Sequence, residues 1–445
     1  MAEIFPFHAW RYDSRRVRLA DVVTQPYDKI TPEMQERYLA ADPFYNFIRI
    51  EKGPATADDS AGNNVYTRAK LSLGNWIREG VLRRDREPAI YPYFQEYTVP
   101  GTGLRRTRKG FITLGRLEDY SAGVIFRHEH TLPGPKADRL ELLRQTRTQT
   151  GLLFMLYQDP ERATDRLIDE AAESEPVAEA TDELGVTHRL WMLSDPAAVA
   201  ALAGMIAPKR LLIADGHHRY ETALAFRNEC RQASGRSDPA APHERAMMAL
   251  FNADGEGLTI LPTHRLVFGI PDFAFDAFRR RIEPQFDCRS YPFASASERE
   301  GALDEFRREL ERQASTRTAI GAYAGGGAFH LFLLRDDAGA AGRLADLTPA
   351  ERQLDVVLLH RVMLEGGLGI TPNDVSGEKR VGYERQLESA LSAVDAGRAQ
   401  LALLLNPARI ELVAQTAFAG RVLPEKSTDF YPKLLSGLTL YRLDD

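Results

Sequence analysis

The segment 211–225 constrains the fold of this chain more than any other. It reads LLIADGHHRYETALA, so a short apolar run passes through an acidic residue and a glycine into apolar residues at helical spacing. A short apolar run bounded by turn residues is typical of a buried strand, and Gly216 tolerates the backbone of a sharp turn. We therefore expect a strand, a tight turn with Asp215 as the N-cap, and then a helix.

The start of this helix is a candidate anion site. Backbone N–H groups of a first helical turn lack intrahelical partners and lie at the positive end of the helix dipole. His217, His218 and Arg219 add side-chain donors at the same end, so a phosphate or a carboxylate is the natural ligand. We interpret Asp215, His217 and His218 as catalytic candidates, and Gly216 and Arg219 as phosphate-binding ones. The alternative is a capping aspartate beside structural histidines.

The same segment allows a metal hypothesis. His217 and Glu221 are four residues apart, so they share one face of a helix, and Asp215 is a third ligand candidate. Such a set suits Mg²⁺ or Mn²⁺ better than structural zinc. The alternative is that Glu221 balances the charge of a neighbouring histidine or arginine.

Composition limits the class of protein. A chain of 445 residues is too long for one ordinary core, and 44% hydrophobic with 27% charged residues is typical of a soluble globular protein. The net charge of −6 argues against nucleic acid as a partner. Cys230 and Cys288 lack CxxC spacing, which excludes a disulfide framework and a thiolate zinc site. With no secretory signal and no apolar run long enough to cross a membrane, we expect a cytoplasmic protein without a membrane partner.

Alternating strand-like and helix-like segments predict a mixed α/β (α+β) fold. Residues 89–99 and 109–117 flank a glycine-containing turn and predict a hairpin, and residues 63–82 carry apolar residues at helical spacing. We expect three regions: an N-terminal α+β region at 1–159, a helix–strand–turn–helix core at 160–270, and an α/β region at 271–445 that packs back on the core.

A second group of candidates lies in the loop FRHEHTLPGPKADRL. Acids, imidazoles and cations together are what phosphoryl transfer requires, namely a base and positive charge around the moving group. Glu129 is the favoured base. The predicted anion contacts are Arg127, His128, His130, Lys136 and Arg139. The alternative is a solvated charged loop.

Four other stretches supply weaker candidates. Asp28 follows a Pro-Tyr turn, and Asn46 and Arg49 lie on a β-like run, where they would point to opposite faces. His264 and Arg265 follow a proline and are candidate anion ligands. Lys433 lies in a C-terminal segment that either closes over a phosphate or docks the chain end through Phe430 and Leu434.

Several stretches together resemble one bacterial family, the domain of unknown function 1015. They are QPYDKI (25–30), DPFYNFIRIE (42–51), RHEHTLPGPKADRLELLRQTRTQTG (127–151), ADGHHRYETAL (214–224), ILPTHRLV (260–267) and STDFYPKLLSGL (427–438). The matches span nearly the whole chain.

A more distant resemblance covers about 30 residues that end in the DGHHR turn. They are similar to the core of the ParB/sulfiredoxin-like superfamily, which includes sulfiredoxins, CTP-dependent ParB clamps and free-serine kinases, and whose members bind nucleotide phosphates at this turn. The resemblance implies phosphate binding by Gly216, His217, His218 and Arg219, with Asp215 as base or Mg²⁺ ligand. Because His217 stands where sulfiredoxin has its cysteine, peroxiredoxin repair is not expected.

Together these features predict a phosphoryl-transfer enzyme for a small hydroxy or amino acid, with serine or phosphoserine preferred. Mg²⁺ and a nucleotide such as ATP or ADP are the expected cofactors. Two alternatives stay open: a nucleotide-binding regulator without small-molecule turnover, and a metal-dependent hydrolase.

Overall fold

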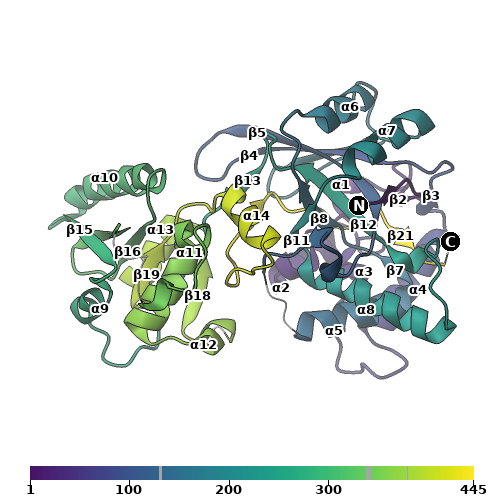
Figure 1. Cartoon of the computed structure of the whole chain (residues 1–445). Helices are drawn as coiled ribbons and strands as arrows, with labels where there is room; N and C mark the ends of the chain where they lie inside the picture. The colour runs from purple at the N-terminus through teal and green to yellow at the C-terminus, as the bar shows by residue number, and fades with distance from the viewer. Residues whose placement is uncertain (130–132, 337–341, 378, 445) are drawn as a thin grey trace. The chain divides into compact units, whose positions relative to one another are not determined.

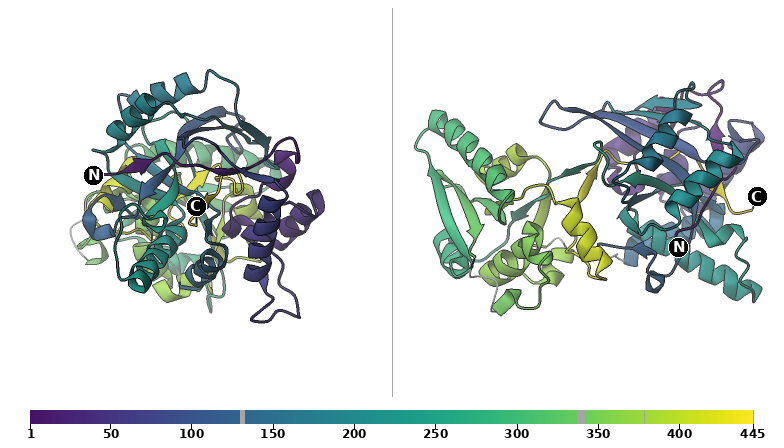
Figure 2. Two further views of the ribbon diagram at one scale, coloured as in Figure 1. Left: turned by 90° about the vertical axis from the view of Figure 1, so that its right-hand side faces the viewer. Right: turned by 45° about the horizontal axis from the view of Figure 1, so that its top comes forward.

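The computed structural model describes residues 1–129, 133–336, 342–377 and 379–444. The chain forms two compact units. Unit 1 contains Met1–Arg127, Thr131–Thr259 and Phe430–Asp445, and unit 2 contains His128–His130 and Ile260–Asp429. Both ends of the chain therefore belong to unit 1 (Figures 1 and 2). The three-region division at residues 160 and 271 stays a prediction.

Unit 1 is built on a nine-stranded mixed sheet in the order β6-β11-β8-β12-β5-β4-β10-β9, with β1 paired to β5. The pairs β11–β6 and β12–β8 are parallel and the others are antiparallel. The strands are β1 (Ile4–Phe5), β4 (Tyr91–Thr98), β5 (Arg105–Arg116), β6 (Ile125–Phe126), β8 (Leu153–Tyr157), β9 (Ala178–Thr181), β10 (Thr187–Leu190), β11 (Leu211–Asp215) and β12 (Arg245–Asn252). The predicted hairpin is confirmed as β4 and β5.

Short strands and helices complete unit 1. Two small sheets pair β2 (Trp10–Tyr12) with β3 (Leu82–Arg84), and β7 (Thr148–Gln149) with β21 (Tyr441–Arg442). The helices are α1 (Leu19–Val22), α2 (Pro32–Ala41), α3 (Ile48–Glu51), α4 (Val65–Arg78), α5 (Pro133–Thr146), α6 (Ala163–Ala171), α7 (Pro196–Ile206) and α8 (His217–Ser234). Helix α5 packs on both α4 and α8 (Figure 1). Helix α4 confirms the helix predicted for residues 63–82. Asn64 is its N-cap and forms a capping box with Thr67.

The two faces of the unit 1 sheet are buried in different ways. On one face, Ile168 of α6 and Leu202 of α7 join Phe111, Met155 and Leu250 in the core. The other face carries Phe154 and Phe251, and the C-terminal Phe430 packs on Phe154 with ring centroids 5.4 Å apart. The chain end is thus docked on the sheet, as the Phe430 alternative expected.

Unit 2 is an antiparallel six-stranded sheet in the order β15-β17-β16-β19-β14-β18. Its strands are β14 (His264–Val267), β15 (Phe286–Pro292), β16 (Ala319–Tyr323), β17 (Ala328–Leu334), β18 (Val381–Glu384) and β19 (Leu401–Leu404). Its helices are α9 (Phe275–Ile282), α10 (Ala296–Ala314), α11 (Asp355–Leu358), which continues as a π-helix at Leu359–Leu368, α12 (Pro372–Ser376), α13 (Leu387–Asp395) and α14 (Ile410–Phe418). Strands β13 (Thr259–Leu261) and β20 (Asp429–Tyr431) lie where the chain passes between the units.

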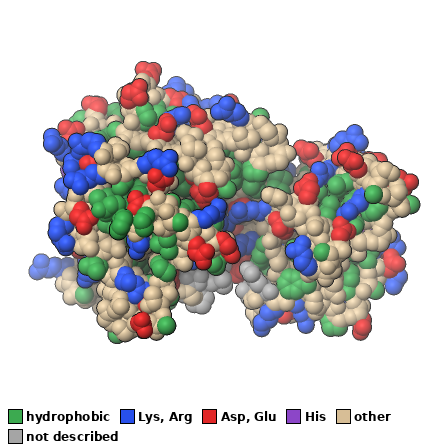
Figure 3. Space-filling view, turned by 180° about the vertical axis from the view of Figure 1, so that it is seen from behind, with side chains coloured by type: hydrophobic (Ala, Val, Ile, Leu, Met, Phe, Trp, Pro, Cys, Tyr) green, Lys and Arg blue, Asp and Glu red, His purple; other side chains and the backbone are tan. Residues whose placement is uncertain are grey.

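These elements confirm the mixed α/β class. Among the described residues, no helix is long and apolar enough to cross a membrane. On the face shown in Figure 3, acidic and basic side chains are interspersed.

Candidate functional site

The predicted strand–turn–helix is present as β11, Gly216 and α8, with one correction. Asp215 is the last residue of β11, and Gly216 is the N-cap of α8. Gly216 has φ +94°, a conformation that residues with a Cβ rarely adopt, so the sharp turn requires glycine. Gly216 has no side chain that could cap the helix, and the first turn contains no acidic residue. The positive end of the helix dipole is therefore not balanced by an acidic side chain of its own first turn.

Arg219 is held in place by two glycines and a carbonyl. A Cβ added at Gly151 would lie 3.0 Å from Arg219 Nη1, and one added at Gly216 would lie 3.2 Å from Arg219 Nε. Nη1 donates to the carbonyl oxygen of Leu152 at 2.6 Å. The guanidinium therefore fills space that only glycine leaves free.

Asp215 lies between two cations. Arg219 Nη2 donates to Oδ2 at 3.0 Å, and Lys433 Nζ lies 3.5 Å from Oδ1. Burial would raise the pKa of Asp215, but Lys433, Arg219, Lys29 and His217 together hold that pKa well below its ordinary value. The carboxylate is therefore ionised at neutral pH. Lys433 thus lies near Asp215 and follows the docked Phe430, and closure of this segment over a phosphate stays a prediction.

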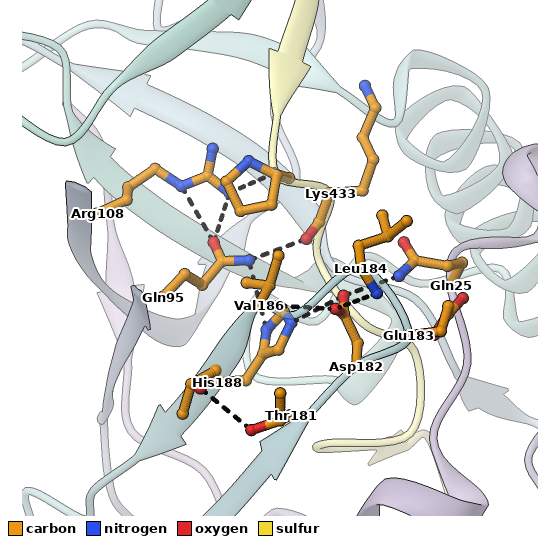
Figure 4. Close-up of polar contacts among 12 residues, drawn as sticks. Gln25, Gln95, Arg108, Thr181, Asp182, Glu183, Leu184, Val186, His188 and Lys433 are labelled. Carbon is orange, nitrogen blue, oxygen red and sulfur yellow. Dashed lines mark hydrogen bonds and ion pairs between the residues drawn. The ribbon is translucent and has the colours of Figure 1, made fainter. Parts of the chain in front are cut away.

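Lys433 is positioned through its backbone by a buried pair of side chains (Figure 4). Arg108 donates from Nε to Gln95 Oε1 at 3.0 Å, from Nη1 to the Tyr431 carbonyl at 3.2 Å and from Nη2 to the Pro432 carbonyl at 2.5 Å. Gln95 Nε2 donates to the carbonyl oxygen of Lys433 at 2.9 Å. Burial lowers the pKa of Arg108 to about 10, and the guanidinium also lies over the ring of Phe154 at 4.5 Å.

The same polar network reaches the QPYDKI motif (Figure 4). His188 Nδ1 lies 2.6 Å from the Tyr93 hydroxyl, and His188 Nε2 lies 3.3 Å from Asp182 Oδ2. Gln25 Nε2 donates to Asp182 Oδ2 at 3.0 Å. Because Gln95 Nε2 also lies 3.4 Å from His188 Nδ1, the chain of contacts joins Gln25 to the segment that carries Lys433.

The QPYDKI motif places charged groups near Asp215 and Arg219. It forms a short 3₁₀ helix at Tyr27–Lys29. Burial raises the pKa of Tyr27 to about 12, and Arg219, Asp28, Arg139 and Asp215 are the charges that act on it. Arg139 lies over the Tyr27 ring at 4.3 Å. Asp28 and Arg139, predicted from separate motifs, therefore both belong to the surroundings of Arg219.

Glu221 bridges two cations from the second predicted loop. Its Oε1 accepts from Arg127 at 3.0 Å and its Oε2 accepts from Lys136 at 2.9 Å. These contacts agree with the alternative in which Glu221 balances neighbouring positive charge, and both cations come from residues 127–139. Within the described ranges, no group of three or more His, Cys, Asp or Glu side chains has an arrangement that could hold a metal ion.

Asn46 and Arg49 do not lie on a strand, so that expectation is wrong. Ile48–Glu51 forms helix α3, because Asn46 Oδ1 accepts from the Ile48 N–H at 2.9 Å and starts a turn. Asn46 Nδ2 donates to the carbonyl oxygen of Asp21 at 2.6 Å, and Arg49 donates to the carbonyl oxygen of Pro43. Their contacts are with the backbone.

Four predicted residues belong to unit 2. His128 is fully buried, with Nε2 2.8 Å from the Thr428 hydroxyl, and Glu129 Oε1 accepts from the Ser427 N–H at 3.0 Å. Arg265 is also buried and donates to the carbonyl oxygens of Thr263, Glu425 and Lys426, while His264 Nδ1 accepts from the Leu405 N–H at 3.1 Å. Their roles at a phosphate site stay predictions. His130 lies outside the described residues.

Three residues near Asp215, Arg219 or Lys433 were not predicted from the sequence. Lys29 and Glu51 lie inside motifs that were recognised, so the motifs were the available signal. Arg108 lies in an alternating basic strand, RRTRKG, where nothing in the sequence distinguishes the one buried arginine from the more accessible Arg105 and Arg106.

This arrangement can bind an anion. The N-terminal end of α8, a buried guanidinium and two lysine ammonium groups lie around the Asp215 carboxylate, and Asp28 and Glu51 also act on the guanidinium. Preorganised positive charge of this kind stabilises the charge on a transferring phosphoryl group.

Comparisons with known proteins give a family and distant structural matches. The family model described as "Protein of unknown function (DUF1015)" matches residues 4–357. No curated protein matches the chain. A conserved hypothetical protein from Pyrococcus furiosus is similar with a TM-score of 0.33 and 13% identity, over 72% of this chain and 93% of that chain.

Two further solved structures are similar at the same level. One is a free serine kinase in complex with AMP, with a TM-score of 0.32 and 13% identity over 69% of this chain and 83% of that chain. The other is SbnI with C-terminal truncation from Staphylococcus aureus, with a TM-score of 0.35 and 9% identity over 73% of this chain and 85% of that chain. Likenesses this distant carry no argument about function, which therefore depends on the residues of this chain.

Proposed function

This chain belongs to the DUF1015 family, and we propose that it is a phosphoryl-transfer enzyme for a small hydroxy or amino acid, with serine or phosphoserine preferred. The observation that carries the proposal is the ionised Asp215 carboxylate at the N-terminal end of α8, in contact with Arg219 and near Lys433. These groups provide the positive charge that a transferring phosphoryl group requires.

The low pKa of Asp215 favours an orienting role over the role of general base. A carboxylate whose pKa lies far below neutral is a weak proton acceptor, because a general base works best with a pKa near the working pH. We therefore assign Asp215 to orienting Arg219 and Lys433, which then bind the phosphoryl oxygens together with the first-turn N–H groups. Proton removal from the hydroxyl group, or from water, is assigned to His218, which follows Gly216 in the same unit.

Mg²⁺ does not fit a site made by these side chains alone. The two oxygens of Asp215 already face Arg219 and Lys433, and the described part of the chain offers no cluster of three ligand side chains. A divalent cation that entered with nucleotide phosphates would need fewer protein ligands. No step proposed here passes through the metal.

The test is a pair of reactions on the purified protein, each with Mg²⁺ and with EDTA. One measures phosphate release from O-phosphoserine, and the other measures phosphoserine formation from serine with ATP or ADP. His218→Ala is the test variant and His243→Ala, a histidine outside the site, is the matched control. We expect one reaction to proceed and to be lost by at least about a hundredfold in His218→Ala only.

Each outcome has a distinct meaning. Phosphate release without nucleotide identifies a phosphatase, and nucleotide-dependent phosphoserine formation identifies a kinase. If neither reaction occurs with any nucleotide, the serine proposal is wrong. Nucleotide binding without turnover would then support the regulator, and a gel shift with nonspecific DNA at low salt would test a DNA partner.

A further inference from the structure

A cavity in unit 1 borders Arg219. About 490 Å³ of space between its walls is not filled by atoms when space open to solvent is included, and about 50 Å³ of it can hold the centre of a water-sized molecule. Most of its wall is apolar, with Leu142, Leu153 and Ala223 among the lining residues. The charged residues that line it are Glu51, Arg139 and Arg219. Arg219 therefore belongs both to this cavity and to the site at Asp215.

Glu51 is an unusual carboxyl group in this cavity. Its side chain is 1% exposed, and its Oε2 has no hydrogen-bond partner among the described residues. The nearest cation, Arg139, has Nη1 at 3.9 Å from Oε1, beyond hydrogen-bonding distance. That Nη1 donates to the backbone carbonyl oxygen of Glu51 at 2.8 Å, and the Nε and Nη2 atoms contact Asp138. A buried acceptor without a donor costs free energy, so the cavity favours a ligand that supplies one.

Other buried glutamates of this chain are satisfied. Glu244 accepts from Arg231 at both carboxyl oxygens, at 2.7 and 2.5 Å. Glu351 accepts from Arg421 at both oxygens, at 3.1 and 3.2 Å. Glu51 differs because no arginine reaches its second oxygen. This difference indicates a binding role for Glu51, since a purely structural carboxyl group has its partners within the fold.

The carboxyl group and the guanidinium of Arg219 face the same position. A Cβ added at Gly151 would lie 3.0 Å from Arg219 Nη1 and 3.6 Å from Glu51 Oε1. Arg219 Nε is also buried without a hydrogen-bond partner in the described structure. A ligand next to Gly151 therefore lies beside Glu51 Oε1 and Arg219 Nη1, and the unsatisfied atoms Oε2 and Nε belong to the same two side chains.

We propose that this cavity binds the amino end of the substrate, and that Glu51 selects hydroxy compounds that carry a primary amine over those that lack one. The inference rests on the proposed function for the identity of the other, phosphorylated end. The ammonium group donates to Glu51 Oε2, while the hydroxyl or phosphate end lies toward Arg219 and Asp215. Glu51 binds substrate in this scheme and takes no part in bond making.

Calorimetric binding to the whole chain tests the proposal. The probes are L-serine, ethanolamine and 3-hydroxypropanoate, which is serine without its amine. The proteins are the wild type, Glu51→Gln, and Glu141→Gln as a control on α5 outside the cavity. We expect both amines to bind the wild type at least about tenfold more tightly than 3-hydroxypropanoate, and Glu51→Gln to lose that preference.

The wild-type measurement decides the question even if Glu51→Gln folds poorly, which thermal unfolding would reveal. Equal affinity for serine and 3-hydroxypropanoate, or no binding of either amine, overturns the inference. A loss in Glu51→Gln that is equal for all three probes also overturns it. If phosphoryl transfer is equally efficient with and without the amine, only this inference fails. If amine selectivity is present without phosphoryl transfer, only the proposed function fails.

Discussion

Arg108 Nη2 donates to the carbonyl oxygen of Pro432 at 2.5 Å, across 324 residues of sequence. The donor lies in the middle of β5, and the acceptor immediately precedes Lys433, whose ammonium group lies 3.5 Å from Asp215. A buried guanidinium therefore holds the backbone next to Lys433. The Lys433 side chain then adds a second positive charge beside Asp215. Strand β5 thus positions Lys433 beside Asp215 through the backbone of the C-terminal segment.

Arg108→Met should destabilise unit 1 and weaken the site. Methionine fills similar space but removes the donors that Arg108 gives to Gln95 Oε1 and to the Tyr431 and Pro432 carbonyl oxygens, at an expected loss of about 2–4 kcal/mol in the free energy of unfolding. Activity should fall as well, because Lys433 loses its support. Urea unfolding and the phosphoryl-transfer assay measure the two effects. The exposed Arg105→Met on the same strand should change stability by less than about 0.5 kcal/mol, and equal losses in both variants would contradict this account.

Gly216→Ala should cost more than Gly235→Ala at the other end of α8. Both residues have positive φ, +94° and +63°, so both variants carry backbone strain of about 1 kcal/mol. Only at Gly216 does the new Cβ also meet Arg219, with Nε at 3.2 Å, whereas nothing lies within 4 Å at Gly235. We expect a larger loss of stability, by about 1 kcal/mol or more, and a loss of activity in Gly216→Ala alone. If Gly235→Ala is equally inactive, the position of Arg219 is not what matters.

Glu221→Gln should have a small, salt-dependent effect. Its partners Arg127 and Lys136 are each 36% exposed, and partly exposed ion pairs of this kind contribute about 0.5–1 kcal/mol that salt screens. Thermal unfolding at low and high salt measures the difference, with Glu170→Gln, at an exposed position of α6, as a surface control. Metal analysis of the two purified variants adds a second readout. A transition metal present in the control and lost in Glu221→Gln would restore the metal hypothesis.

Unit 2 should lose stability as pH rises from about 4 to 7. Burial raises the pKa of Asp355 to about 7, above its ordinary value near 3.9. The folded state therefore binds a proton more tightly than the unfolded state, so this contribution is complete below pH 4 and is lost as pH rises through 7. Chemical unfolding of the wild type and Asp355→Asn across this range tests it. The variant should show a flatter pH profile, and identical profiles would assign the pH dependence elsewhere.

The sequence by itself determined the local elements and several site residues. The apolar run before Asp215, the glycine and the helical spacing after it specify β11 and α8, because strand burial, positive φ and helix periodicity are all local properties. The β4–β5 hairpin follows from the same kind of pattern. The family motifs also contained Lys29 and Glu51, although their roles could not be read from spacing.

Only the tertiary structure decided which of these residues meet. A local pattern predicted Asn46 and Arg49 on a strand, but Asn46 accepts from the Ile48 N–H and starts a helix, while its Nδ2 is held by the distant carbonyl oxygen of Asp21. The sequence pattern could not show that Arg108 is buried while the arginines beside it are more accessible. Burial depends on which strands and which chain end cover that face of the sheet. The sequence pattern also does not predict that Lys433 lies near Asp215, or that Glu51 Oε2 lacks a donor among the described residues. Those relationships arise from packing between segments far apart in sequence, and the chemistry of the site depends on them.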